Sequence, residues 1–287
     1  MKIVLSPNPY RDKGLRAAQS ARETLEAAGA QCCMCFPFEL DRGGVDVPAH
    51  MEFLSEEEAF DGADMLVCFG GDGTILHSAK EAQRHNVPIL GVNLGSVGFM
   101  AELEASELSM LPRLIQGKYR IEERMMLDVA VRREGRVVCR ETALNDAVST
   151  KGAVARIIDL DVKADGVLVS GFSGDGVIIS TPTGSTAYAM SAGGPIVEPA
   201  ADNILITPIC PHTLHARSFV LDGRRAVAVR MAKTSRKSAY LSVDGGKAFR
   251  LGGGDQVELR RSRARVRLVR LTGRSFYTAV NQKLGRS

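Results

Sequence analysis

Tryptophan is absent from this sequence of 287 residues, and aromatic residues make up only 5% of it. Proteins that bind single-stranded nucleic acid stack bases on aromatic rings, so a broad surface of that kind is excluded. No apolar run approaches the roughly 20 residues needed to cross a membrane. The first apolar run, Met1–Leu5, is too short for a signal peptide. These absences predict a cytoplasmic protein with no nucleic acid and no membrane as partner.

The six cysteines lack the pattern of a disulfide framework or a zinc site. Three are crowded together and three stand singly: Cys32, Cys33, Cys35, Cys68, Cys139 and Cys210. A structural zinc site needs two ligand pairs at characteristic spacings, and the sequence does not offer them. We therefore expect reduced thiols. The net charge of +4 suits an anionic substrate but is too small to indicate nucleic acid.

The first part of the chain alternates between strand and helix patterns. Continuous apolar runs predict buried strands, and Ala- and Glu-rich stretches between them predict helices. The predicted elements are a strand over Lys2–Leu5, a helix over Leu15–Ala28, a strand over Met65–Phe69, a helix from Thr74 to Arg84 and a strand over Pro88–Val92. Such alternation predicts a Rossmann-like α/β domain with a parallel sheet, over residues 1–120.

The second part is rich in short strands. Ala164-Asp165-Gly166 lies between two apolar runs and predicts a hairpin, because Asp-Gly accepts positive φ angles. Further strands are expected over Leu127–Val131, Arg136–Cys139, Val177–Ser180, Ala226–Val229, Tyr240–Val243 and Val257–Leu271. This pattern predicts a mainly antiparallel, β-sandwich-like domain over residues 121–271. A tail over residues 272–287 is expected to pack back on the first domain.

The segment Gly70-Gly71-Asp72-Gly73-Thr74 follows a predicted buried strand and precedes a predicted helix. Glycines let several backbone N–H groups approach one anion, and the helix N-terminus adds partial positive charge. Asp72 would repel phosphate, so it is better suited to accept a proton from an attacking hydroxyl or to hold a divalent cation. Thr74 can cap the helix or contact phosphate. The alternative is a tight turn in which Asp72 merely caps the helix.

This loop resembles the signature shared by NAD kinases, diacylglycerol and sphingosine kinases, and 6-phosphofructokinases. It lacks the Gly-Lys-[Ser/Thr] of a P-loop. The signature implies phosphoryl transfer to a hydroxyl group, without naming the acceptor.

A second segment, Asp175 to Tyr188, is similar to a hallmark of NAD kinases and continues through Ser191-Ala192-Gly193-Gly194-Pro195. Its small residues and hydroxyls expose backbone groups, and Tyr188 offers a ring for stacking on a base. The alternative is a structural turn with Tyr188 in the core. Asn145-Asp146 resembles a third family element, usually Asn-Glu, in which an amide and a carboxylate bind a purine edge and a ribose diol.

The resemblance implies an NAD kinase that uses ATP and a divalent cation, with Mg²⁺ expected and its ligands not identified. It implies that Asp72 accepts the proton of the 2′-hydroxyl. The phosphate loop would be Gly70, Gly71, Gly73 and Thr74. The residues implied to bind NAD are Asp72, Gly73, His77, Asn145, Asp146, Arg156, Ser173, Asp175, Thr186, Ala187, Tyr188, Ala189, Met190 and Ser191. Relatives are commonly homodimers or homotetramers.

Two other functions remain open at this point. A diacylglycerol-type lipid kinase shares the Gly70–Thr74 loop, and a regulator could bind NAD(P) without catalysis. Vesicle binding would mark the first, and tight NAD(P) binding without phosphoryl transfer would mark the second.

Overall fold

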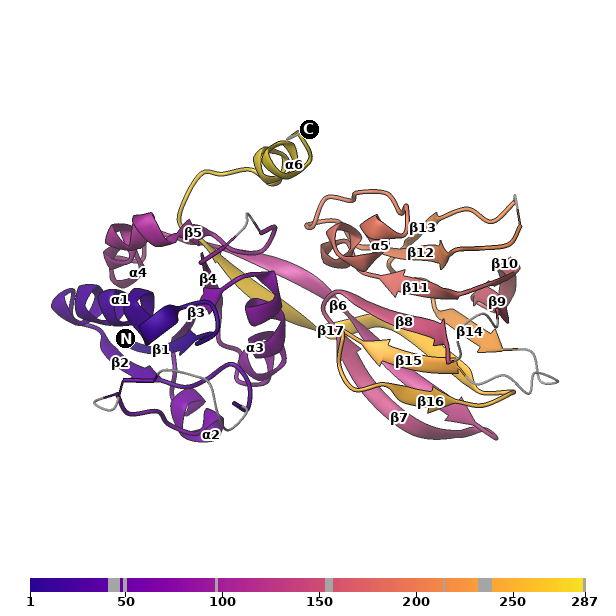
Figure 1. Ribbon diagram of the computed structural model, residues 1–287, viewed down its shortest axis with the longest axis horizontal. Helices are drawn as coiled ribbons and strands as arrows, with labels where there is room; N and C mark the ends of the chain where they lie inside the picture. The colour runs from indigo at the N-terminus through magenta and orange to yellow at the C-terminus, as the bar shows by residue number, and fades with distance from the viewer. Residues whose placement is uncertain are drawn as a thin grey trace. The chain divides into compact units, whose positions relative to one another are not determined.

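The computed structural model describes residues 1–40, 47–48, 51–95, 98–152, 157–213, 215–231 and 239–285. The chain divides into two compact units (Figure 1). Unit 1 comprises Met1–Glu123 and Val266–Ser287, and unit 2 comprises Arg124–Arg265. The predicted fold class is confirmed, because unit 1 is α/β with a parallel sheet and unit 2 is built of antiparallel strands.

Unit 1 is organised around a parallel sheet in the order β17-β4-β3-β1-β2, with β5 also paired to β4. Its strands are β1 (Lys2–Pro7), β2 (Gln31–Met34), β3 (Met65–Gly70), β4 (Ile89–Asn93), β5 (Leu103–Glu104) and the end of β17 (Gln256–Arg270). All of β3 and β4 is buried, as their continuous apolar runs predict.

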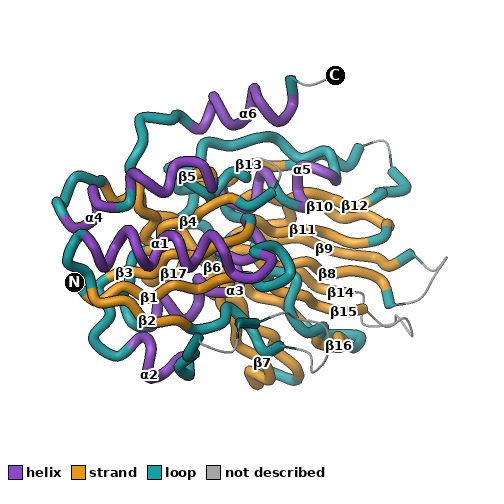
Figure 2. Tube along the Cα trace, turned by 60° about the vertical axis from the view of Figure 1, so that its left-hand side comes forward, coloured by secondary structure: helices purple, strands orange, loops and turns teal. Residues whose placement is uncertain are grey.

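Helices cover both faces of this sheet. On one face, α1 (Arg16–Ala27) packs against β1 and β2 (Figure 2). Its buried Ala21 and Leu25 join the same core cluster as Leu5. On the other face, α3 (Asp72–Arg84) packs against β3 and β4. The remaining helical segments of unit 1 are η1 (Lys13–Leu15), α2 (Glu56–Phe60), η2 (Ala105–Met110), α4 (Pro112–Ile115) and α6 (Phe276–Leu284).

Unit 2 contains two sheets. The first has the order β10-β9-β14-β17-β6-β7 and is formed by β6 (Arg120–Arg133), β7 (Arg136–Ala143), β9 (Ile158–Ala164), β10 (Val167–Gly174), β14 (Val227–Met231) and the first part of β17. The second has the order β13-β12-β11-β8-β15-β16. It is formed by β8 (Asp146–Lys151), β11 (Gly176–Ser180), β12 (Asn203–Ile209), β13 (Phe219–Asp222), β15 (Ala239–Val243) and β16 (Phe249–Leu251).

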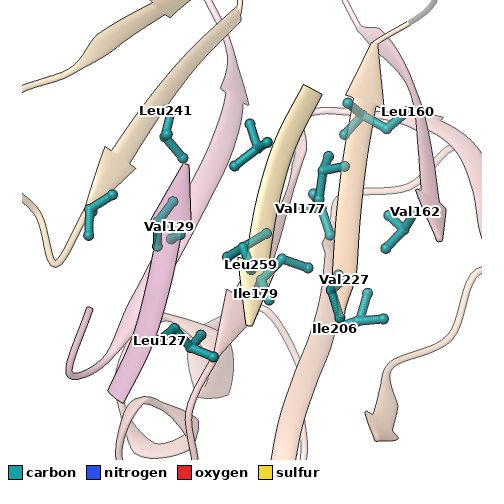
Figure 3. Packing of buried hydrophobic residues seen from close by; sticks show 14 of the residues in the cluster. Leu127, Val129, Leu160, Val162, Val177, Ile179, Ile206, Val227, Leu241 and Leu259 are labelled. Atoms are coloured by element: carbon teal, nitrogen blue, oxygen red, sulfur yellow. The ribbon is translucent and has the colours of Figure 1, made fainter. Parts of the chain in front are cut away.

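Side chains from both sheets form one hydrophobic core in unit 2. Val129 and Leu259 from the first sheet pack with Val177, Ile179 and Leu241 from the second (Figure 3). Alternate residues along each strand enter this core, so the sheets form a sandwich. Two short helical segments, η3 (Thr183–Thr186) and α5 (Tyr188–Ser191), follow β11.

Two local predictions have clear outcomes. Asp165 and Gly166 have φ angles of +48° and +85° between the antiparallel strands β9 and β10, so the predicted Asp-Gly hairpin is confirmed. The predicted start of α3 at Thr74 is wrong by two residues, because Gly71 is the N-cap and Asp72 lies in the first turn. Among the residues described, no helix is both long and apolar enough to span a membrane.

Candidate functional site

The glycine-rich loop lies at the carboxyl end of β3. A Cβ atom at Gly70 would lie 2.1 Å from Thr74 Oγ1, so only glycine fits there without displacement. By contrast, a Cβ atom on Gly71 or Gly73 would meet no described atom within 4 Å. The backbone around these two glycines therefore faces open space at the start of α3, where a helix N-terminus favours an anion.

Asp72 is held by the segment that follows β4. Its Oδ2 accepts a hydrogen bond from the backbone N–H of Phe99 at 2.8 Å, and its Oδ1 accepts one from Met100 at 3.0 Å. Gly98 approaches so closely that an added Cβ would lie 2.3 Å from Asp72 Oδ1. The alternative in which Asp72 only caps its helix does not hold, because the N-cap is Gly71 and no side-chain cap is formed.

A pocket of about 350 Å³ surrounds this loop within unit 1. It is lined by Asn8, Arg11, Phe38, Gly70, Gly71, Asp72, Gly73, Thr74, His77, Asn93, Gly95, Gly98 and Lys283. Asp72 is the acidic member of this set, and Arg11, His77 and Lys283 are the basic ones. The set therefore combines one carboxylate with three groups that can attract phosphate.

The topology explains why these distant residues meet. Asn8 follows β1, Gly70 ends β3, and Asn93 ends β4, so all three lie at the carboxyl ends of parallel strands. β1 lies between β3 and β2, and the helices that follow β1 and β3 cover opposite faces. Open α/β sheets bind ligands at such a switch point. Here Asn8 Nδ2 donates to Thr74 Oγ1 at 3.0 Å, which connects the first strand to the loop.

In unit 2, Asp244 organises the segment Leu144–Asp146. Its carboxylate accepts hydrogen bonds from the backbone N–H groups of Leu144, Asn145 and Asp146 at 2.7, 2.8 and 3.0 Å. In return, the Asp244 N–H donates to the carbonyl of Asp146 at 2.9 Å. Asp146 is only 5% exposed, and burial, with the charge of Asp244 as a smaller cause, raises its pKa to about 7.

The turn after β11 packs directly on the same segment. Thr181 Oγ1 donates to the carbonyl of Leu144 at 2.6 Å, and the Thr181 N–H donates to the carbonyl of Asn145 at 2.9 Å. A Cβ atom at Gly184 would lie 2.1 Å from that same Asn145 carbonyl. The two predicted elements, Asn145-Asp146 and the Thr181–Ser191 segment, are therefore neighbours.

Tyr188 begins α5 and is 45% exposed, which excludes the alternative that its ring belongs to the core. Thr186, Ala187 and Met190 are half-buried and Ser191 is exposed. Ala189 differs, because it is fully buried in a cluster with Val148, Ile178 and Ile209. Its side chain is therefore part of the core.

The chain matches the models of two domain families. Residues 18–119 match the ATP-NAD kinase N-terminal domain, and residues 144–271 match the ATP-NAD kinase C-terminal domain. An NAD kinase of Acetivibrio thermocellus is 37% identical over 285 residues, covering 99% of this chain and 97% of the relative. One from Symbiobacterium thermophilum is 41% identical over 285 residues, covering 99% and 98%. The chain belongs to the NAD kinase family.

Solved NAD kinase structures share the fold. A yeast NADH kinase complexed with NADH aligns with a TM-score of 0.85 and 25% identity, covering 100% of this chain and 88% of that one. An NAD kinase from Archaeoglobus fulgidus in complex with ATP aligns with a TM-score of 0.76 and 24% identity, covering 99% of each chain. The resemblance to NAD kinases is thus confirmed, and neither the lipid kinase nor the regulator is favoured.

Within this family framework, the predicted site residues fall in three places. Gly70–Thr74 and His77 line the unit 1 pocket, and Asn145, Asp146 and Thr186–Ser191 belong to two unit 2 segments that meet at Thr181 and Gly184. Asp175 forms an ion pair with Lys151 at 2.6 Å, and Ser173 Oγ donates to Asp159 at 2.5 Å. Arg156 lies outside the described residues.

The sequence prediction missed several pocket residues of this NAD kinase family member. Asn8 and Asn93 carried a usable signal, since each is a polar residue at the end of a predicted parallel strand. No sequence pattern indicates Gly98, Arg11 or Lys283 as pocket residues, because only the folded chain brings them to the loop. Asp244 was not among the predicted residues, and its hydrogen bond to the Asn145 N–H is visible only in the structure.

Proposed function

We propose that this protein transfers the γ-phosphoryl group of ATP to the 2′-hydroxyl of the adenosine ribose of NAD, forming NADP and ADP. The observation that carries the proposal is the position of Asp72. Its carboxylate lines a pocket together with open glycine backbone and three basic side chains, in a chain of the NAD kinase family.

In this reaction Asp72 accepts the proton of the 2′-hydroxyl as the oxygen attacks the γ-phosphorus. The new O–P bond forms while the bond between the γ-phosphorus and the bridging oxygen breaks, and ADP leaves with that electron pair. The hydrogen bonds that fix the carboxylate come from the backbone N–H groups of Phe99 and Met100. Such positioning is the main protein contribution in phosphoryl transfer.

A divalent cation, with Mg²⁺ as our proposal, fits the donor set of this pocket. No group of three or more His, Cys, Asp or Glu side chains that could hold a metal occurs among the described residues. Mg²⁺ at phosphoryl-transfer sites keeps several waters and is held largely by substrate phosphates, so the ATP phosphates beside Asp72 would supply most of its ligands. When bound, the cation neutralises charge on the phosphate oxygens.

For NAD binding we propose the residues that the family resemblance implies. Asn145 and Asp146 bind the adenosine, and the half-exposed ring of Tyr188 stacks on the adenine, flanked by polar groups of Thr186 and Ser191. Ala187 and Met190 belong to the same unit 2 segment as Tyr188, and buried Ala189 contributes only through its backbone. Gly73 contacts the dinucleotide, and His77 lies near its phosphates. Asp175, Ser173 and Arg156 make further contacts with NAD.

We also propose that the chain forms a homodimer or homotetramer. Light scattering coupled to size-exclusion chromatography measures this mass directly, and a monomer at micromolar concentration would contradict the proposal.

The test is an assay for NADP formation with NAD or NADH crossed against ATP or polyphosphate. Asp72→Asn should lower kcat by about 10²- to 10⁴-fold, the usual contribution of a proton acceptor, while NAD still binds. Asp128→Asn, which removes an exposed carboxylate from β6, is the matched control and should keep full activity. If none of these combinations yields product, the proposed function is wrong. If Asp72→Asn keeps near-normal turnover, the proposed role of Asp72 is wrong.

A further inference from the structure

The C-terminal helix α6 brings a lysine to the phosphate pocket. No residue of this nine-residue helix is buried, yet Lys283 in its last turn lines the pocket with the Gly70–Thr74 loop. Lys283 Nζ lies 4.4 Å from the centroid of the Phe99 ring, and the Phe276 ring at the start of the helix lies 6.1 Å from the same ring. Phe99 therefore contacts both ends of α6 and, through its N–H, Asp72.

The segment before α6 is anchored more firmly than the helix itself. Glu102 accepts hydrogen bonds from the backbone N–H groups of Leu271 and Thr272, and Arg274 forms an ion pair with Glu107 and donates to the carbonyl of Glu102. Ser275 then caps α6 by accepting from the Thr278 N–H at 3.3 Å. The start of the helix is thus fixed in unit 1, and its last turn is held by surface contacts with Phe99.

The charges around Lys283 favour a phosphate ligand. Within the described part of the chain, no ion pair of Lys283 with a carboxylate is found, and Asp72 already accepts two backbone N–H groups. The Gly70–Thr74 loop itself contains no cation, whereas a P-loop places a lysine on the β- and γ-phosphates. A triphosphate beside Asp72 needs positive charge from elsewhere, because the Asp72 carboxylate repels it.

We infer that Lys283 binds the phosphate groups of the nucleoside triphosphate donor, so that the C-terminal helix adds a lysine to Arg11 and His77 around a loop that contains no cation. This inference rests on the proposed phosphoryl transfer. The γ-phosphoryl group must reach the hydroxyl beside Asp72, so we place the triphosphate in the pocket that Asp72 and Lys283 both line. The cation–π interaction with the Phe99 ring holds the Lys283 side chain at the pocket before ATP binds.

The experiment compares Lys283→Gln, Lys283→Arg and the wild-type protein. KM is measured for ATP and for NAD, and ATP binding is measured by calorimetry in the presence of Mg²⁺. Lys283→Gln should weaken ATP binding about 10- to 100-fold, the usual effect of losing a charge-assisted hydrogen bond, and change KM for NAD less than about threefold. Lys283→Arg keeps the charge and should restore most of the affinity.

Lys118→Gln is the matched control, because it removes one exposed positive charge of unit 1 from outside the pocket. Its ATP affinity should match that of the wild type at 0.15 M salt, where distant charges are screened. Unchanged ATP affinity in Lys283→Gln would overturn the inference, and so would an effect on KM for NAD alone. If the wild type forms no NADP but Lys283→Gln still loses ATP affinity, the proposed reaction fails and the phosphate contact stands.

Discussion

The carboxyl groups of Asp146 and Asp244 interact, and the charge of Asp244 adds to the effect of burial in raising the pKa of Asp146. The same Asp244 carboxylate accepts the backbone N–H of Asp146. One side chain therefore both fixes the position of Asp146 and opposes its ionisation. This arrangement gives two separable predictions.

The first prediction concerns the pH dependence of stability. The folded-state pKa of Asp146 is about 7, above its unfolded value, so folded Asp146 keeps its proton between about pH 4 and 7 while the unfolded chain loses it. The contribution of Asp146 to stability should therefore decline as pH rises through this window, by up to about 4 kcal/mol. Urea unfolding of Asp146→Asn from pH 4.5 to 8 should lack this component. Identical pH profiles for both proteins would contradict the assignment.

The second prediction concerns NAD binding. An ionised carboxylate accepts hydrogen bonds from ribose hydroxyls more strongly than a protonated one. KM for NAD should therefore fall as pH rises through about 7, and this inflection should be absent in Asp146→Asn. In Asp244→Asn the inflection should move to lower pH, because the neighbouring charge is gone. A KM profile unaffected by either substitution would show that Asp146 does not contact the ribose.

Asp244 also makes a structural contribution that can be measured. Asp244→Ala leaves three backbone N–H groups without their charged acceptor, and we expect the free energy of unfolding to fall by about 2 to 4 kcal/mol. Asp222→Ala, at an exposed carboxylate paired with Arg224, should lower the free energy of unfolding much less, because solvent screens exposed ion pairs. Equal losses from the two substitutions would contradict this expectation.

Gly98→Ala tests the positioning of Asp72. The added Cβ would lie 2.3 Å from Asp72 Oδ1, so the carboxylate or the segment containing Phe99 must shift. A shift of this size should lower kcat about 100-fold, with stability little changed. Gly273→Ala, where a Cβ atom would meet nothing within 4 Å, is the control. If Gly98→Ala retained wild-type kcat, the geometry of Asp72 would not limit the reaction.

A buried ion pair supports the same region of unit 1. Arg270 and Glu102 are 8% and 5% exposed, their side chains are joined at 3.2 Å, and Arg270 also donates to the carbonyl of Met100 at 3.0 Å. In Glu102→Ala, Arg270 keeps its ion pair with Glu122 at 3.0 Å, but the backbone N–H groups of Leu271 and Thr272 lose their acceptor. We expect the free energy of unfolding to fall by about 2 to 4 kcal/mol. A double-mutant cycle with Arg270→Met measures the coupling, and additive losses would show that the pair is not coupled.

The sequence allowed the architecture to be predicted because local patterns encode it. The apolar run Met65–Phe69 and the Asp165-Gly166 turn specify a buried strand and a hairpin without reference to the rest of the chain. The sequence pattern predicts the start of α3 two residues late, because the extended Gly71 rather than Thr74 ends the loop. A local pattern does not distinguish these two positions.

The surroundings of Asp72 could not be predicted, since they depend on contacts between distant residues. Met100 lies 28 residues away, and Lys283 more than 200. Asp72 itself was identified from the chemistry of a carboxylate in a glycine-rich loop. The groups that hold the Asp72 carboxylate lie in the segment after β4, and only the structure shows that this segment packs against Asp72.

The path of β17 has a consequence for the order in which the protein is built. Its residues from Val266 onward belong to unit 1, whereas unit 2 is the single continuous stretch Arg124–Arg265. During synthesis, unit 2 has all of its residues before unit 1 has the β17 residues that pair beside β4. The unit translated first is therefore completed last, and until then Ile89 of β4 lacks the partner that Leu268 of β17 provides.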